Sequence, residues 1–428
     1  MSFIADFHIH SHYSRATSPQ CNALGLNKWG QIKGIKVIGT GDFTHPQWFN
    51  ELQEKLEEAE PGLFKLKKQY AEEVKPEVPL ACWDEMRYML STEISTIYSK
   101  NDRVRKIHSV VCAPSFESAA KINDELSKIG NLKADGRPIL GLDCKELLKI
   151  VMDASPESMF ILAHIWTPHF SVFGSASGFD SIDECFEDMV PHITALETGL
   201  SSDPAMNWLW SDLDRFTLVS NSDAHSPMKL GREANRLNTE LDYYAMKEAV
   251  KRGDPNQFLE TIEFYPEEGK YHYDGHRTCK VCLSPEETAK NKGLCPECGK
   301  KVTIGVCNRV KSLADRKNPE LRPNRIPFRY LVPLTDILAN LFGTSPNTKR
   351  VLNEYFTLVS ELGNEFHILL DAPVPDIERV AGAQIATAID KMRRGDIHIE
   401  PGYDGEYGKV QVFSDTDMKE SSNQQALF

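Results

Sequence analysis

The stretch Phe3-Ile-Ala-Asp-Phe-His-Ile-His10 decides the fold prediction, because it joins a short apolar run to a pair of histidines. Residues two apart on a strand lie on the same face, so the imidazoles of His8 and His10 can bind one cation. A lone His-x-His pair is weak evidence for a metal site. Its value comes from the similar runs that follow it along the chain.

Six further runs have the length and apolar composition of strands, and most end in His, Asp or Glu. They are residues 36–42, 88–93, 107–113, 159–164, 193–197 and 216–225. Helical candidates, such as residues 46–60 and 115–129, lie between them. Seven strands alternating with helices predict a parallel α/β architecture closed into a distorted barrel. Because parallel strands end on one face of a barrel, we expect their polar terminal residues to converge there.

Seven more residues near these strand ends are candidate ligands of a metal cluster. They are Asp42, His45, Glu93, His108, His164, Asp223 and His225. Mixed imidazole and carboxylate groups suit Zn²⁺, Mn²⁺ or Fe²⁺ better than Mg²⁺ alone. Glu93 is the best candidate for a carboxylate that bridges two cations. Such a cluster activates water against a phosphate ester, and we find no serine or cysteine with a credible partner for a nucleophilic role.

The order of these motifs resembles the PHP family, whose members are distorted (β/α)7 barrels that use two or three metals on phosphate esters. The resemblance implies that His8, His10, Glu93 and Asp223 hold one metal, with Glu93, Asp223 and His10 as catalytic residues. It also implies that Glu93, His108 and His164 hold a second metal, and that His225 with Asp42 or His45 contributes to a third. Many PHP proteins have Thr-Asp-His after the second strand, whereas this chain has Gly41-Asp-Phe-Thr-His45. Either the histidine is displaced to position 45 or the third site is weak.

Four of the ten cysteines form two close pairs, Cys279-Lys-Val-Cys282 and Cys295-Pro-Glu-Cys298. Each pair can supply one edge of a tetrahedron, so Cys279, Cys282, Cys295 and Cys298 predict a structural zinc site. A redox role for either pair is the alternative. The other six cysteines are scattered singly, which is typical of small core residues in a reducing cytoplasm.

Charge is distributed unevenly along the chain, whose net charge is −13. Residues 276–330 contain thirteen Lys and Arg against five Asp and Glu, an excess of eight positive charges. A basic module on an acidic body suits a protein that binds a polyanion on one face, although a solvated loop surface would look the same. The candidate phosphate contacts are Arg309, Lys311, Arg322, Arg325 and Arg329.

The combination of PHP barrel, four-cysteine module and helical C-terminal region resembles the endonuclease Q family along nearly the whole chain. Three segments carry the match: Trp166-Thr-Pro-His-Phe170, Gly174-Ser-Ala-Ser-Gly-Phe-Asp-Ser181 and Ser220-Asn-Ser-Asp-Ala-His-Ser-Pro227. This family cleaves DNA on the 5′ side of hypoxanthine, uracil, xanthine or abasic sites. Damaged bases are read outside the stack, which requires a nearby pocket. The candidate DNA contacts beside the metals are His12, Trp166, His169, Gly174, Ser175, Ser177 and Gly178.

Four regions are expected: a catalytic domain (1–255), a zinc-binding basic module (256–330), a helical domain (331–413) and a flexible tail (414–428). The tail ends in Gln424-Gln-Ala-Leu427-Phe428, which resembles the pentapeptide that binds the bacterial sliding clamp. Gln424, Leu427 and Phe428 are the expected clamp contacts. The sequence shows neither a secretory signal nor a membrane span, so a cytoplasmic, nucleoid-associated location is expected.

Three other interpretations remain open. A PHP phosphomonoesterase would act on a small metabolite, but it has no need of a zinc module and a basic stretch. A PHP exonuclease would trim DNA ends. A protein that binds DNA and the clamp without catalysis is disfavoured by the full set of candidate ligands.

Overall fold

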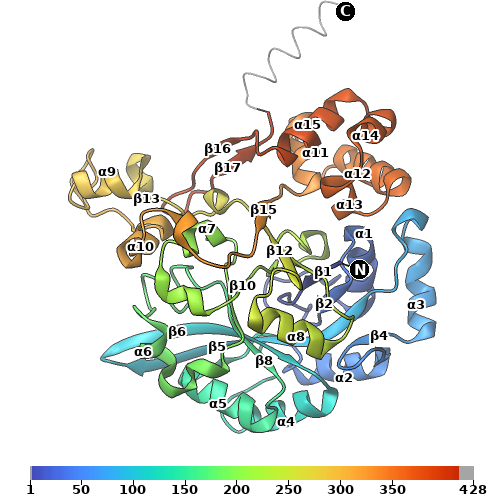
Figure 1. Cartoon of the computed structure of the whole chain (residues 1–428), viewed down its shortest axis with the longest axis horizontal. Coiled ribbons are helices and arrows are strands. Elements are labelled where there is room, and N and C mark those ends of the chain that lie inside the picture. Colours follow the sequence, from blue (N-terminus) through green and yellow to red (C-terminus); the bar gives the residue numbers. More distant parts are fainter. Residues whose placement is uncertain (1, 414–428) are drawn as a thin grey trace, which may run out of the picture.

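The computed structural model describes residues 2–413, and its largest sheet has 13 strands. Seven of them form the curled barrel sheet in the lower half of Figure 1. They are β1 (Phe3–Asp6), β2 (Val37–Gly39), β5 (Arg87–Lys100), β6 (Arg103–Ala113), β8 (Met159–Leu162), β9 (Ala195–Glu197) and β10 (Leu218–Val219). Each lies within or overlaps one of the seven runs expected from the sequence.

The ends of this sheet return to each other beyond β10 and β1. The amide of Asp223 donates to the carbonyl of His8 at 2.9 Å, and the amide of His10 donates to Ala224 at 3.0 Å. Ile9 and Ala224 form a parallel bridge. The residues that follow the last barrel strand therefore lie beside those that follow the first, which confirms the distorted barrel.

One strand runs against the parallel order that the sequence predicted. β6 is antiparallel to both β5 and β8, whereas β1, β2, β5, β8, β9 and β10 keep the parallel direction. β5 and β6 form one long hairpin whose turn is Asn101-Asp102, both with positive φ. Because β6 runs backwards, its beginning faces the mouth of the barrel. This explains why His108 lies at the mouth although it comes near the start of the run expected at residues 107–113, and it is the sixth residue of β6.

Helices cover the outside of this sheet and alternate with its strands. They are α1 (Ala23–Lys33), α2 (Pro46–Lys55), α3 (Lys68–Val74), α4 (Phe116–Ser127), α5 (Cys144–Ala154), α6 (Ile182–Phe186), α7 (Pro204–Asn207) and α8 (Tyr243–Arg252). The helix expected at residues 46–60 ends at Lys55, where a short hairpin of β3 (Leu56–Glu58) and β4 (Phe64–Leu66) begins. The short strand β7 (Ile139–Leu140) pairs with β5.

The main sheet continues past the barrel into the region expected to be a separate module. β11 (Ala234–Leu237) pairs with β1, β12 (Phe258–Glu263) pairs with β11, and β15 (Phe328–Tyr330) pairs with β12. Both ends of residues 256–330 are therefore tied to the sheet of the catalytic domain.

Between them lies the zinc module proper, drawn in yellow and orange in Figure 1. It contains β13 (Asp274–His276), β14 (Val281–Leu283), α9 (Pro285–Lys290) and α10 (Val306–Leu313). A small hairpin forms between β16 (His398–Glu400) and β17 (Lys409–Gln411). Its connecting loop contacts this module, since Tyr273 bridges to Tyr403.

The C-terminal helices are α11 (Leu334–Phe342), α12 (Lys349–Leu362), α13 (Glu365–Leu370), α14 (Val374–Ala381) and α15 (Ala383–Arg393). α11 ends at Gly343, whose φ of 62° is readily adopted only by glycine. α12 begins at Lys349, after residues 345–348 form a turn. The buried ion pair of Lys33 and Glu365, at 2.7 Å, joins these helices to α1 of the barrel. Within residues 2–413, no helix is long and apolar enough to cross a membrane.

Candidate metal centre

Four side chains from three distant parts of the sequence meet at the mouth of the barrel. They are His8, His10, Glu93 and Asp223, and their nearest donor atoms lie within 4.8 Å of one another. His10 Nε2 is 3.2 Å from Glu93 Oε2 and 3.1 Å from Asp223 Oδ1. His8 Nε2 is 3.6 Å from the same oxygen of Glu93. The structure thus brings together the four residues expected at the first metal.

A second group lies on the other side of Glu93. His108 Nδ1 and His164 Nε2 are 2.5 Å and 3.1 Å from Glu93 Oε1. One oxygen of Glu93 therefore faces the first group and the other faces the second. This is the position of a bridging carboxylate, as the sequence predicted.

The donor atoms are placed to bind divalent cations and not to hydrogen-bond with one another. His8 Nε2, His10 Nε2 and Asp223 Oδ1 are buried, and none has a hydrogen-bond partner among the described residues. Buried polar atoms without partners are costly, so their convergence indicates a ligand. Burial opposes ionisation of Glu93, but the adjacent imidazole of His108 and the guanidinium of Arg137 outweigh it and hold the pKa of Glu93 well below its usual value. Burial also lowers the pKa of His108 to about 4, which keeps this imidazole neutral for metal binding.

The other nitrogen of each first-group histidine is held by a carboxylate behind it. Both oxygens of Glu197 lie 3.0 Å from His8 Nδ1, and Asn221 donates to Glu197. Asp42 Oδ1 lies 3.0 Å from His10 Nδ1. These contacts leave Nε2 of both histidines free to face the cluster, which is how a metal-binding imidazole is usually oriented.

The third site expected from the sequence does not assemble among residues 2–413. Asp42 is committed to His10, and its Oδ2 accepts from the amide and hydroxyl of Ser11 and from Ser14. His45 stacks on Tyr13 with ring centroids 4.3 Å apart. His225 lies near His10, and its Nδ1 is 2.9 Å from the carbonyl of Asp223. Asp42 is a support for a ligand, and the described groups contain neither His45 nor His225.

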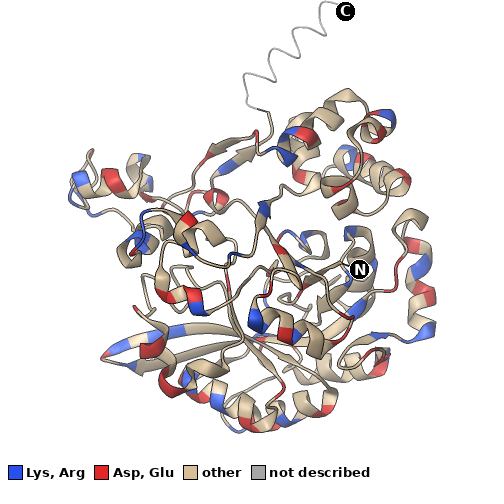
Figure 2. Cartoon of the chain, in the orientation of Figure 1, with Lys and Arg blue, Asp and Glu red and all other residues tan. Residues whose placement is uncertain are grey.

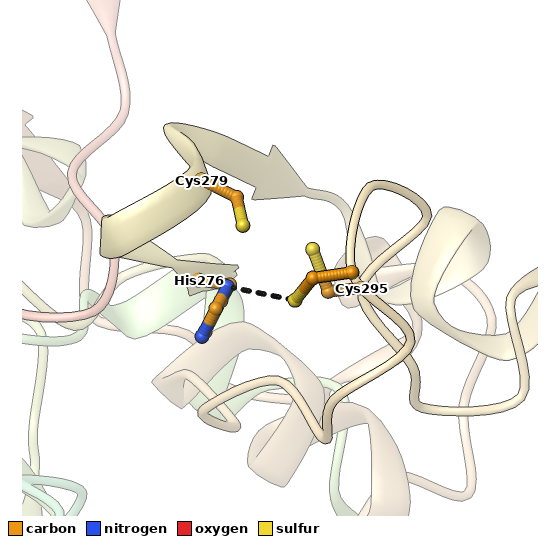
Figure 3. A group of neighbouring side chains, drawn as sticks. His276, Cys279 and Cys295 are labelled. Carbon is orange, nitrogen blue, oxygen red and sulfur yellow. Dashed lines mark hydrogen bonds between the residues drawn. The ribbon is translucent and has the colours of Figure 1, made fainter.

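The expected cysteines of the zinc module cluster near His276, and three of them form a compact group of donor atoms with this histidine. Figure 3 shows His276, Cys279 and Cys295 pointing toward one another, and Cys298 completes the group. His276 Nδ1 is 3.5 Å from Cys298 Sγ. Cys282 is outside this compact group, and its Sγ lies 4.0 Å from the carbonyl of Pro401. Three thiols and one imidazole are a usual ligand set for structural zinc.

The loop after β8 is more buried than its composition suggested. Trp166 is 1% exposed and its indole N–H donates to Asn207, so it fills the core and cannot stack on a base. Gly174, Ser177 and Gly178 are buried as well. A Cβ on Gly174 would lie 2.4 Å from the carbonyl of Thr167, so this glycine serves chain packing rather than close approach of a ligand. Ser175 and His169 are exposed, and His12 is half-buried.

The basic residues after the zinc module are mostly paired with nearby acceptors. Arg309 donates to the carbonyls of Phe173 and Phe179 and to Asp180, and it thereby fastens α10 to the loop after β8. Arg322 is 9% exposed and donates to Phe216, which leaves it unable to reach DNA. The other three basic residues expected to contact phosphates pair with carboxylates: Lys311 with Glu286, Arg325 with Glu320, and Arg329 with Glu260.

Three residues of the two sites were missed by sequence reasoning. His276 had a signal, since it precedes Cys279 by three residues and a His-x-x-Cys spacing can clip a metal. Glu197 also had one, because it ends the run at residues 193–197. Arg137 had none: it lies in a loop, and only the fold brings its guanidinium to 2.9 Å from Glu93.

Comparison with known proteins places the chain among uncharacterised relatives and solved nucleases. Residues 333–396 match the model of the MJ0043 C-terminal domain. MJ0043 of Methanocaldococcus jannaschii is 33% identical over 261 residues, which is 58% of this chain but only 31% of that protein. YqxK of Bacillus subtilis is 31% identical over 310 residues, covering 71% of this chain and 74% of YqxK.

Two solved structures match almost the whole fold. One is the lesion-specific endonuclease PfuEndoQ of Pyrococcus furiosus, with a TM-score of 0.81 and 26% identity over 98% of this chain and 99% of the other. The second is an endonuclease Q complex with duplex DNA carrying an abasic lesion, with the same TM-score and identity over 98% of both chains. The chain therefore belongs to the same family as YqxK, and it is an endonuclease Q-like protein.

Proposed function

We propose that this protein is a metal-dependent endonuclease that cuts damaged DNA, on the 5′ side of hypoxanthine, uracil, xanthine or an abasic site. The observation that carries the proposal is the pair of ligand groups that share Glu93 at the barrel mouth. The likeness to solved endonuclease Q structures over 98% of the chain supports the choice of DNA as substrate.

The chemistry follows from the charge of the substrate. Divalent cations bound at this mouth neutralise a phosphodiester and lower the pKa of bound water. His8, His10 and Asp223 would hold one cation and His108 with His164 the other, while Glu93 contacts both. Zn²⁺, Mn²⁺, Fe²⁺ or Mg²⁺ are the candidates. Glu197 and Asp42 fix the imidazoles, so that the cations keep their positions when DNA arrives.

DNA would approach the mouth and extend toward the zinc module. Four lysines of the module, Lys290, Lys292, Lys300 and Lys301, are exposed and are available to successive phosphates. Figure 2 shows blue segments along this part of the molecule. His12, His169 and Ser175 remain the candidate contacts close to the lesion, because their side chains are not buried.

We also infer a protein partner, the bacterial sliding clamp. The pattern Gln424-x-x-Leu427-Phe428 supports it, since two apolar residues after a glutamine match the clamp-binding pentapeptide. These residues lie outside the described part of the chain. A fluorescent peptide of residues 419–428 should bind a bacterial clamp, and a peptide with Ala at Leu427 and Phe428 should not.

The proposed activity is tested with covalently closed circular DNA that contains a single deoxyuridine, hypoxanthine or abasic site. With Mn²⁺ or Mg²⁺, the protein should convert each circle to a nicked form with the break 5′ to the lesion, and it should leave undamaged circles closed. An exonuclease cannot open a closed circle, and a phosphomonoesterase leaves it intact.

Asp223→Ala is the matched loss-of-function variant. It should abolish nicking, because Asp223 is a ligand of the first group, while binding to the same DNA persists. Undiminished nicking by Asp223→Ala would refute the metal assignment, and failure of the wild-type protein on all three circles would refute the proposed activity.

A further inference from the structure

Among residues 2–413, Arg137 is the one Lys or Arg that pairs with a carboxylate of the two ligand groups. Its Nη1 donates to Glu93 Oε2 at 2.9 Å, the same oxygen that faces His8 and His10. Its side chain is 31% exposed, so the guanidinium contacts the cluster while part of the side chain reaches solvent. An arginine is charged at every working pH.

The loop that carries Arg137 is held on both sides of the residue. Before it, Gly136 donates its amide to Tyr13 and packs so closely that a Cβ there would lie 2.4 Å from Asp42 Oδ2. After it, the carbonyl of Pro138 accepts from Ser95 on β5. The amide of Arg137 itself donates to Asp135. The backbone on both sides of Arg137 is therefore held in place, and the guanidinium lies against Glu93.

A positive charge in this position conflicts with the cations that the ligands imply. Two divalent cations would carry four positive charges, which the four carboxylates of Glu93, Asp223, Glu197 and Asp42 balance, and Arg137 adds one positive charge beyond that balance. This surplus charge favours the binding of an anion beside the cations and Arg137, since like charges at short distance repel. A guanidinium also matches the oxygens of a phosphate with two parallel N–H donors.

We propose that Arg137 binds the phosphate group at the cleavage position, exchanging Glu93 for a phosphate oxygen when metals and substrate are in place. This inference rests on the proposed function for the nature of the substrate, but its core is the binding of a phosphate anion. Arg137 is then a group that contacts the substrate, and it would stabilise the charge that grows on the phosphate during hydrolysis.

The test compares Arg137→Gln with the wild-type full-length protein by three measurements. The affinity of metal-free protein for Mn²⁺ should rise several-fold, because a competing charge is removed from Glu93. The affinity of the Mn²⁺-loaded protein for inorganic phosphate, measured by calorimetry, should fall about tenfold. The kcat/KM for nicking should fall about 100-fold, the loss typical of removing one charge-stabilising donor.

Two further variants keep the test decisive. Arg137→Lys retains the charge without the planar pair of donors and should restore part of the phosphate affinity. Arg252→Gln removes an arginine at the exposed end of α8 and should leave all three measurements within about twofold of wild type. If Arg137 only holds Glu93 in place, Mn²⁺ affinity falls instead of rising, and the inference is wrong. Unchanged phosphate affinity also overturns it.

The outcome is separable from that of the proposed function. Phosphate and Mn²⁺ binding are measured without DNA, so the expected pattern can hold even if the lesion-bearing circles are not cut. Conversely, lesion-specific nicking with unchanged phosphate affinity in Arg137→Gln would sustain the function and reject the role of Arg137.

Discussion

Three residues at the barrel mouth have backbone conformations that side chains other than glycine rarely adopt. Asp42, His164 and Asp223 have φ of 53°, 29° and 46°. Positive φ costs of order 1 kcal/mol or more for such residues, and it persists only where neighbours fix it. Asp42 is fixed by His10 and Ser11, and Asp223 by its backbone bond to His8. The strain indicates that the mouth is built for ligand placement rather than for stability.

The carboxylate behind His8 supports a first prediction at this scale. Glu197→Gln should lower metal affinity by about 10-fold, because the neutral amide no longer holds and polarises His8 as a carboxylate does. Titration of the metal-free protein with Mn²⁺ measures the effect. Glu157→Gln, an exposed carboxylate that pairs with Lys247, is the control. Equal affinities in wild type and Glu197→Gln would show that Glu197 does not support the centre.

Glu263 supports a prediction about pH. Burial raises the pKa of this carboxyl to about 8, and its Oε2 lies near the hydroxyls of Thr198 and Ser220. Between the unfolded pKa near 4.5 and pH 8, the folded protein keeps this proton and the unfolded chain loses it. Stability from this group is therefore complete at low pH and is lost as the pH rises through this window.

Glu263→Gln mimics the protonated form and should remove that loss. Relative to wild type, the variant should gain about 2 kcal/mol in free energy of unfolding between pH 6 and pH 8. Urea denaturation at the two pH values measures it, with Glu157→Gln as the exposed control. Wild-type and variant stabilities that change in parallel with pH would contradict the assignment.

At this scale, sequence reasoning found the ligands that end strands and missed those that depend on loops. His8, His10, His164 and Asp223 were identified because they follow strands whose ends share a face, and Glu93 and His108 because the apolar runs around them stop or start there, although both lie in the middle of longer strands. Asp42 does lie at the mouth, but its carboxylate contacts Nδ1 of His10, which faces away from the cluster, and not a metal position. Sequence spacing does not encode which side of the imidazole a carboxylate contacts. Arg137 could not be found, since nothing in residues 131–138 fixes the direction of that loop in advance.

At the scale of elements, the reversal of β6 is the main departure from the expected barrel. The sequence contains a signal for it, since Asn101-Asp102 joins the two strands and Asn and Asp tolerate the left-handed conformations of a two-residue hairpin turn. The apolar run that predicts the strand stops at Glu93, however, whereas β5 continues to Lys100. Residues 94–100 become polar toward Lys100, so their composition alone does not predict a strand. They are extended because they pair with residues 103–109 of β6.

The zinc hairpin yields a prediction about two neighbouring residues. His276→Ala should lose most of the bound zinc, because the imidazole completes the group with Cys279, Cys295 and Cys298. Cys282→Ser should retain it, since that thiol faces Pro401. Zinc content per chain by atomic emission measures both. The opposite pattern, with zinc lost from Cys282→Ser and kept in His276→Ala, would show that the four cysteines bind the zinc.

At the scale of the whole molecule, charge separates the zinc module, which we propose faces DNA, from the acidic remainder. The net charge is −13, yet residues 276–330 carry a positive excess. The arginines of that region serve mainly as links to the barrel, as Arg309 does, and the exposed lysines remain for phosphates. Binding should therefore depend strongly on salt and mainly through the lysines.

Replacing Lys290, Lys292, Lys300 and Lys301 together with Gln tests this division. The slope of log affinity against log salt should decrease by about 0.9 for each phosphate that the variant no longer neutralises. Fluorescence anisotropy with an abasic duplex, measured over a series of salt concentrations, gives the slope. Arg309→Met should leave the slope unchanged but lower the melting temperature, because it unfastens α10. A reduced slope in Arg309→Met would show that Arg309 contacts a DNA phosphate.

The position of β1 inside the sheet governs the order in which the molecule can be completed. β1 lies between β2 and β11, and the residues after it pair with Asp223 and Ala224. During synthesis the first strand emerges long before those partners, so one of its edges must wait for more than half of the polypeptide to leave the ribosome. Half of the first ligand group waits with it. An unfinished chain thus cannot assemble the complete first ligand group. Activity that depends on this group can begin only when the barrel has closed on its N-terminal strand.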